Sequence, residues 1–261
     1  MLLLCFLFLF VISVDAQQSS GLGFSGMGSG AAPSNAVTYT VIVDNETNDP
    51  INVYFFAAPA KFNNKDGQFT NSLGTQTVQP GTSQARFTIT YSFFAAAQKF
   101  DLPAGEVQST SVSLVPISLQ TDEQHGQRTN VMFDRNSEPY LTTPGVPMGP
   151  TGPAGIVVDG SFQIQTPSYP SGQGKYGIGL GAISGGKFQL STYTMARPGI
   201  TTNVQPVVKF FVSEGETEVG KDANFYSVST GSALCDATTG TTEFIVTRTD
   251  NGKWRVNGEV Q

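Results

Sequence analysis

The chain has 261 residues, of which 13% are charged, and its formal net charge is −6 at neutral pH. Its 14 Lys and Arg residues never stand next to each other, which excludes the clustered basic surface of a nucleic-acid-binding protein. A single histidine excludes zinc, copper and iron sites that are built from several imidazoles. The chain has no GxSxG motif and no phosphate-binding loop, so it resembles neither a common serine hydrolase nor a nucleotide-binding enzyme.

The first 16 residues predict a signal peptide. Leu2–Val14 is almost wholly apolar, but it is shorter than the roughly 20 residues that cross a bilayer. The small residue Ala16 follows where a cleavage site is expected. We therefore expect a secreted, extracellular protein without a stable membrane span. Cleavage would remove Cys5 and leave Cys235 without an intrachain partner. Cys235 is predicted to be a buried thiol, with an intermolecular bridge or a reactive thiol as alternatives.

Residues 17–36 form a second segment, which is rich in Gly and Ser and carries no charge. Such a composition buries too little apolar surface to offset the entropy that is lost when the chain is ordered. We expect a flexible segment that precedes a folded domain at 37–261.

Apolar residues at every second position predict β-strands in the first half of this domain. Such alternation is typical of strands with one buried and one solvent-exposed face. The runs lie at 37–44, 51–55, 86–93 and 109–120. Asn45–Pro50 is dense in turn-forming residues. The run Phe94–Gln98, with sequence FAAAQ, is predicted as a helix-like patch that is too short to affect the fold.

Residues 121–154 show little apolar alternation and hold five prolines from Pro139 to Pro153. Glycine recurs at every third position only at the end of this segment, so a collagen-like triple helix is excluded. We expect extended backbone in a long Pro- and Gly-rich connecting loop. It is either a surface connection within one domain or a linker between two lobes, 37–120 and 155–261.

The alternation resumes in the second half. The runs lie at 160–166, 175–183, 186–195, 205–212 and 242–258. In the last of these, Asp250–Gly252 is typical of a hairpin turn. The sequence therefore predicts an all-β fold, an antiparallel β-sandwich or two β lobes.

Three glycines in the run at 175–183 suggest a ligand site. Gly177, Gly179 and Gly181 would leave one face of a strand bare, which permits close approach of a flat ligand such as a sugar ring. Tyr169 and Tyr176 precede them and could stack on that ligand. The alternative is tight packing of the glycines against another sheet, or a sharply bent strand.

Two further sites follow from local motifs. Glu214, Glu216, Glu218 and Asp222 have the spacing of oxygen ligands in a calcium loop, although the glycines do not match an EF-hand. A solvated acidic loop is the alternative, and no cofactor or other metal is predicted. Asn45–Thr47 is an N-x-T sequon, which predicts a glycoprotein in a eukaryotic secretory pathway.

Three functions remain open. We expect a non-catalytic β-sandwich that binds an extracellular surface, a glycan or a protein partner, because export, low charge and the Gly/Tyr segment favour it. An alternative is a secreted carbohydrate hydrolase, which needs two carboxylates roughly 5 to 10 Å apart. A third is a membrane-active, pore-forming protein, because the Ser/Thr-rich alternation at 109–121 is typical of a membrane-inserting strand.

Overall fold

Three β-sheets make up the part of the chain that the computed structural model describes, which comprises residues 37–63, 67–81, 83–100, 112–121, 125–146, 159–170 and 175–261. The all-β fold predicted from the alternation is confirmed, with several sheets packed together. The predicted signal peptide and the Gly/Ser-rich segment lie outside the described residues.

The largest sheet has nine described strands. In spatial order they are β18 (Glu259–Val260), β17 (Trp254–Val256), β16 (Glu243–Arg248), β1 (Val37–Asn45), β6 (Gln84–Phe100), β11 (Lys175–Ser184), β12 (Lys187–Met195) and β4 (Gln68–Thr70), with β7 (Ser113–Pro116) paired to β6 off this path. All its pairs are antiparallel except β1 with β16. A parallel pair needs a long crossover connection, and here most of the domain lies between the two strands.

The other two sheets are smaller. The four-stranded sheet has the order β15 (Ala233–Asp236), β14 (Lys209–Glu214), β2 (Ile51–Ala57) and β5 (Ser72–Val78). The five-stranded sheet has the order β3 (Lys61–Phe62), β13 (Thr201–Gln205), β10 (Phe162–Gln165), β8 (Arg128–Phe133) and β9 (Pro139–Leu141). In the latter, β8 and β10 run parallel.

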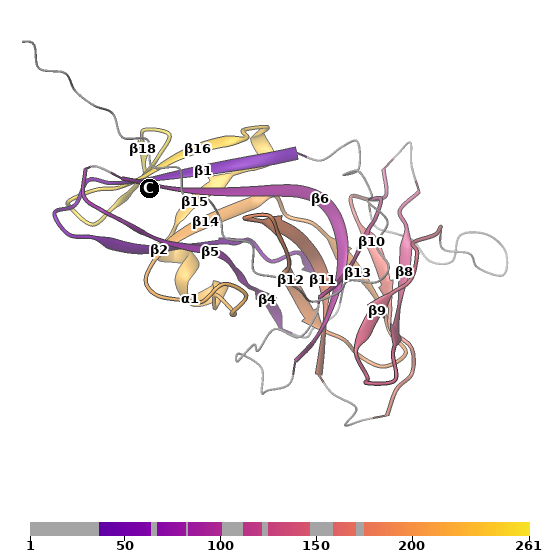
Figure 1. The fold of residues 1–261 in the computed structure, drawn as a ribbon. Helices are drawn as coiled ribbons and strands as arrows, with labels where there is room; N and C mark the ends of the chain where they lie inside the picture. Colours follow the sequence, from indigo (N-terminus) through magenta and orange to yellow (C-terminus); the bar gives the residue numbers. More distant parts are fainter. Residues whose placement is uncertain are drawn as a thin grey trace, which may run out of the picture. The chain divides into compact units, whose positions relative to one another are not determined.

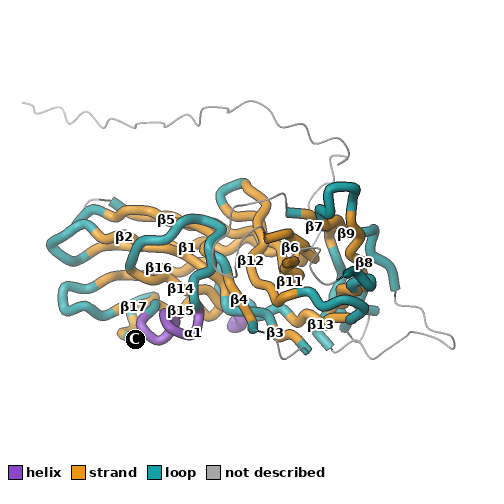
Figure 2. The backbone as a smooth tube through the Cα atoms, turned by 90° about the horizontal axis from the view of Figure 1, so that it is seen from below, coloured by secondary structure: helices purple, strands orange, loops and turns teal. Residues whose placement is uncertain are grey.

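The long strand β6 connects the two regions of the fold. Figure 1 shows it running beside β1 and then bending sharply next to β10 and β13. Its first half, Gln84–Tyr91, pairs with β1, and its second half pairs with β11 and β7. In the view from below, β11 and β12 lie between the group of β1, β2 and β16 and the group of β8, β9 and β13 (Figure 2).

Two hydrophobic cores fill the spaces between the sheets. Val41, Phe87 and Phe55 belong to the core between the large and the four-stranded sheet. Ile178 and Ile164 belong to the core between the large and the five-stranded sheet. Both lie within one compact unit, Pro33–Gln261. The pairs β1–β16 and β6–β11 join strands that precede residue 121 to strands that follow residue 154.

The prediction of a helix-like patch at Phe94–Gln98 is wrong, because these residues continue β6. Here both faces of the large sheet are buried. Ala95 and Ala97 face the core with the five-stranded sheet, while Ala96 belongs to a further cluster on the opposite face with Leu114. All three alanines are fully buried, so the run reflects packing within a sheet and not helix propensity.

The structure also differs from the prediction in the connection 121–154, since β8 and β9 lie inside it. Val131 and Leu141 of these strands are buried in the core with the five-stranded sheet. The alternation was too short to detect, because β8 has six residues and β9 only three. The parts at 122–124 and 147–158 lie outside the described residues.

The outer face of the four-stranded sheet is covered by α1 (Phe225–Val228). The ring of Phe225 lies 5.3 Å from that of Phe211 and 6.4 Å from that of Phe56. Two short 3-10 turns, Ser229–Gly231 and Ala237–Thr239, follow α1 in the chain. Across the described ranges, no helix is both long and apolar enough to cross a bilayer.

Candidate functional site

The two tyrosines predicted to stack on a ligand, Tyr169 and Tyr176, lie together. Their ring centroids are 5.5 Å apart, edge to face, and the ring of Phe133 lies 5.3 Å and 4.7 Å from them. The hydroxyl of Tyr169 donates to the carbonyl of Ala196 (2.9 Å), and that of Tyr176 donates to the carbonyl of Ser137 (3.2 Å). Burial raises the pKa of both phenols. Only 1% of Tyr176 is exposed, so protein covers its ring.

A half-buried ion pair lies beside Tyr176. Nζ of Lys99 is 3.0 Å from Oε1 of Glu138 and donates to the carbonyl of Asn136 (3.4 Å). The Lys99 charge opposes the effect of burial on the pKa of Tyr176, and the Glu138 charge adds to it. Oε2 of Glu138 is buried without a hydrogen-bond partner in the described part. These contacts join β6 to the turn between β8 and β9.

The three glycines of β11 face away from Tyr176. Successive side chains of a strand point to opposite faces, and Ile178 faces the core with the five-stranded sheet. Gly177, Gly179 and Gly181 therefore lie on the other side of the large sheet. The structure brings the two tyrosines together but does not bring Tyr176 and the glycines onto one surface.

Side chains from neighbouring strands fill the space over these glycines. A Cβ atom at Gly177 would lie 2.6 Å from Cε2 of Phe100 and 2.8 Å from Cδ2 of Tyr193. At Gly181 it would collide with the side chain of Leu114. The pairings of β11 with β12 and with β6 also shift register next to Gly181. The register shifts agree with the alternative of a bent strand. The side chains over the glycines belong to β6, β7 and β12 of the same large sheet, so the close packing is not against another sheet.

The four carboxylates predicted as a calcium loop do not gather. Three of them have separate partners: Glu214 pairs with Arg248 (2.8 Å), Glu216 accepts from Asn52 (3.0 Å) and Glu218 pairs with Lys221 (3.1 Å). Burial raises the pKa of the fourth, Asp222. In the described ranges, no three His, Cys, Asp or Glu side chains are close enough together to hold a metal ion.

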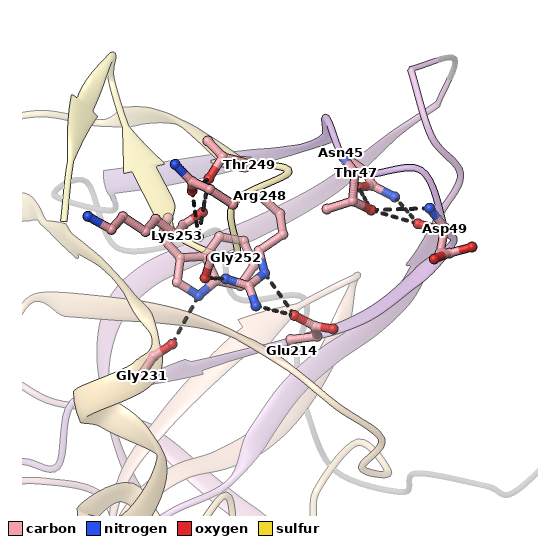
Figure 3. A network of polar contacts seen from close by, with 11 residues as sticks. Asn45, Thr47, Asp49, Glu214, Gly231, Arg248, Thr249, Gly252 and Lys253 are labelled. Atoms are coloured by element: carbon pink, nitrogen blue, oxygen red, sulfur yellow. Dashed lines mark hydrogen bonds and ion pairs between the residues drawn. The ribbon is translucent and has the colours of Figure 1, made fainter.

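Arg248 organises the hairpin of β16 and β17 (Figure 3). Its guanidinium is 2.8 Å from the carboxylate of Glu214 and also donates to the carbonyl of Gly252. The guanidinium carbon lies 5.0 Å from the ring centroid of Trp254, whose Nε1 donates to the carbonyl of Gly231 (3.0 Å). Gly252 has a φ of 78°, in agreement with the predicted turn. These contacts stabilise the hairpin and attach it to β14 and to the turn at Gly231.

The amide of Asn45, the sequon residue, is also engaged (Figure 3). Its Nδ2 donates to the carbonyls of Asp49 (2.8 Å) and Val78 (3.0 Å), and its Oδ1 accepts from the backbone N–H (2.9 Å) and the hydroxyl (2.7 Å) of Thr47. Only 3% of Asn45 is exposed. Both amide hydrogens are used, and an N-linked glycan would replace one of them.

Two open, polar hollows lie at turns of the sandwich. One is lined by Asp44, Asn45, Glu46, Gly81, Ser83 and Gln84, and the other by Asn52, Thr75, Glu216, Thr217, Glu218 and Lys221. In the first, Asp44 accepts from Gln84 (2.8 Å) and Glu46 pairs with Arg255 (2.5 Å). Asp222, whose pKa is raised, lines neither hollow.

The sequence analysis did not identify the outer face of the five-stranded sheet. Phe162, Ile164 and Val204 enter the core, so their neighbours along each strand point outward. We define the amide face as eight outward side chains of β13, β10, β8 and β9, namely Thr201, Asn203, Gln163, Gln165, Arg128, Asn130, Met132 and Tyr140. Gln205 of β13 and the exposed Lys61 of β3 also point outward, at the β3 edge of the same sheet. None of these eight is a carboxylate, although the chain carries a net charge of −6.

Three side chains of the amide face form a hydrogen-bonded row across β13, β10 and β8. Nε2 of Gln163 donates to Oδ1 of Asn203 (2.9 Å), and Oε1 of Gln163 accepts from Nε (2.9 Å) and Nη2 (2.6 Å) of Arg128. The strand register places the three residues side by side. These hydrogen bonds fix both ends of the Gln163 amide inside the row, and only 4% of Gln163 is exposed.

A second row lies beside the first and faces solvent. Thr201, Gln165 and Asn130 are in register on the same three strands. Gln165 is exposed, and its amide makes no hydrogen bond to another described residue. Next to this row, Tyr140 and Met132 pair across β9 and β8 and are 45% and 42% exposed. Amide groups and a phenol ring offer donors, acceptors and a flat apolar surface to a ligand.

No family model matches the chain, and no curated protein or solved structure is significantly similar to it.

Proposed function

We propose that the protein is a secreted, non-catalytic binding protein and that its amide face binds a glycan. The observation that carries the proposal is the pair of rows on this face, in which Gln163 orders one row and Gln165 presents the other to solvent. Sugar hydroxyls need donors and acceptors at defined positions. The Gln165 amide makes no hydrogen bond to another described residue, so its donors and its acceptor are available to such hydroxyls.

The chemistry of the amide face supports binding without cleavage. Hydrolysis of a glycosidic bond commonly uses a pair of Asp or Glu side chains, one as acid and the other as base or nucleophile. The amide face has amides, a hydroxyl, a guanidinium, a thioether and a phenol, but no carboxylate.

A glycan array with the purified protein tests this proposal. We expect the double variant Gln165→Ala/Asn130→Ala to bind its ligand at least about tenfold more weakly, since a loss of about 1.4 kcal/mol corresponds to a factor of ten. The matched control is Thr38→Ala/Thr88→Ala, which removes two exposed polar side chains from β1 and β6 and should bind normally. Unchanged binding by the Gln165/Asn130 variant, or a wild type that binds no glycan, would contradict the proposal.

Secretion is tested separately. Expressed with its own N-terminus in a eukaryotic host, the protein should appear in the medium and begin at Gln17, because the predicted cleavage follows Ala16. Sequencing of its N-terminus gives the answer. A protein that stays in the cell and still begins at Met1 would show that the apolar leader has another role.

A further inference from the structure

The strands of the amide face pair without interruption. The register is continuous from β13 to β10, from β10 to β8 and from β8 to β9. Elsewhere it shifts, in the pairs of β11 with β12 and β6 and in the pair of β2 with β5. Such shifts bend a strand and increase its twist. The amide face therefore presents its rows without a local kink.

The two polar hollows described above lie away from the amide face, since none of its eight side chains lines either of them. Sites for small molecules are usually concave, because a cleft encloses most of the ligand surface. An open sheet face contacts its ligand from one side only. A short soluble sugar would bury little surface here, whereas a polymer surface could contact all the rows at once.

The exposed part of the amide face is uncharged, and the exposed Lys61 lies beside it on the edge strand β3 of the same sheet. Arg128 carries the only charge of the amide face, and Gln163 accepts two hydrogen bonds from that guanidinium. The second row and the pair of Tyr140 and Met132 contain amide, hydroxyl, phenol and thioether groups. These groups match the hydroxyls and C–H faces of a neutral sugar.

We infer that the amide face binds the surface of an insoluble, uncharged polysaccharide whose extended chains lie side by side. The inference rests on the proposed function and names the class of its ligand. Neighbouring strands are about 4.8 Å apart and outward residues along a strand about 6.7 Å apart, so the rows form a regular array of weak contacts. Many weak contacts that are made together give an affinity that one chain does not reach.

Co-sedimentation with microcrystalline cellulose and with chitin tests the inference, together with calorimetric titration of cellohexaose, chitohexaose and soluble polygalacturonate. We expect binding to at least one particulate polymer and at least about 100-fold weaker binding to its hexasaccharide, as the multivalent contact requires. The triple variant Gln165→Ala/Asn130→Ala/Tyr140→Ala should sediment at least tenfold less, and Thr38→Ala/Thr88→Ala should match the wild type.

Each other outcome overturns a defined part of the account. Equal affinity for the hexasaccharide, or binding to polygalacturonate alone, overturns the inference and leaves glycan binding by this protein intact. Binding to none of the polymers and oligosaccharides overturns both. If circular dichroism shows that the triple variant is unfolded, the single variant Gln165→Glu replaces it. Gln165 is exposed, so the introduced charge should weaken sedimentation without unfolding, and unchanged sedimentation overturns the inference.

Discussion

Gly179 is required by its surroundings and not by its backbone angles. A Cβ atom here would collide with the backbone carbonyl of Thr192 on β12, which cannot move aside as a flexible side chain does. We expect Gly179→Ala to lower the free energy of unfolding by about 1–3 kcal/mol, the usual cost of overpacking a core. Chemical denaturation measures this loss.

The matched control is Gly145→Ala. A Cβ at Gly145 would have no neighbour within 4 Å, and its φ does not fall in the left-handed region. This variant should be as stable as the wild type. Equal losses for the two glycines would mean that β11 and β12 do not approach each other as closely as described.

Cys235 is fully buried, and burial raises the pKa of its thiol to about 12. The thiol is therefore protonated at neutral pH and out of reach of reagents, as expected for the buried-thiol interpretation. In a Cys5→Ser background, we expect no reaction of Cys235 with a thiol reagent in the native protein at pH 8. Complete reaction should follow in denaturant. Rapid labelling of the native protein would instead indicate a reactive cysteine, and no labelling even in denaturant would indicate a bridged one.

Asn45 uses both amide hydrogens in the fold. In Asn45→Asp, a carboxylate oxygen would face the carbonyls of Asp49 and Val78, so we expect a loss of about 1–3 kcal/mol in the free energy of unfolding. Asn251→Asp is the control, because the hydrogen bonds of the Asn251 side chain are accepted by its Oδ1, and a carboxylate oxygen can accept them as well. Equal losses would contradict this reasoning. Glycosylation of Asn45 stays a prediction, which the intact mass of the secreted protein tests.

At the scale of elements, two side-chain amides complete open strand edges. Gln261 accepts from the N–H of Leu234 (2.8 Å) and donates to its carbonyl (3.0 Å), as a neighbouring strand would. Gln76 does the same for Arg86 of β6 (3.0 Å and 3.3 Å). Open edges are sites of association between chains, and these contacts cover part of two of them.

We expect Gln261→Ala to lower the free energy of unfolding by about 1–3 kcal/mol, since each hydrogen bond contributes about 0.5–1.5 kcal/mol. Light scattering should also show more self-association, because the edge of β15 is then open. Gln165→Ala serves as the control, since the Gln165 amide makes no hydrogen bond to a described residue. If the two variants are equally stable and equally monomeric, Gln261 does not protect the edge.

The strands with clear alternation were predictable from sequence. β1 and β11 lie where the period of two indicated. In β1, buried residues alternate with partly exposed ones, and in β11, large apolar residues alternate with glycine, in each case over enough residues to be recognised. The short strands β8 and β9 were not, since three to six residues give too few periods. The helix-like interpretation of the alanine run in β6 was wrong because burial on both faces of the strand, which only the fold creates, is not visible in the local sequence.

The candidate site was less predictable than the fold. Proximity of Tyr169 and Tyr176 followed from their closeness in sequence. Their separation from the glycines depends on the face of β11 to which each residue points. The amide face could not be read from the sequence, because it combines single residues of four short strands that lie between Arg128 and Gln205. Nothing local indicates that Gln163 will pair with both Arg128 and Asn203.

At the scale of the whole molecule, both smaller sheets pack against the large sheet. The four-stranded sheet shares a core with the first half of β6, and the five-stranded sheet shares a core with its second half. α1 covers the outer face of the four-stranded sheet, where Phe56 and Phe211 contact Phe225. The outer face of the five-stranded sheet instead presents the amide face. The proposed ligand binding therefore falls on the second of these two outer faces.

Hydroxyl-radical footprinting in the presence of the bound polysaccharide tests this account most directly. Met132 and Tyr140 report on the amide face, while Tyr226 and Phe188, which are 70% and 53% exposed, report on other surfaces. Binding at the amide face should protect Met132 and Tyr140 from oxidation and leave the oxidation of Tyr226 and Phe188 unchanged. Unchanged oxidation of Met132 and Tyr140, with protection elsewhere, would contradict the account.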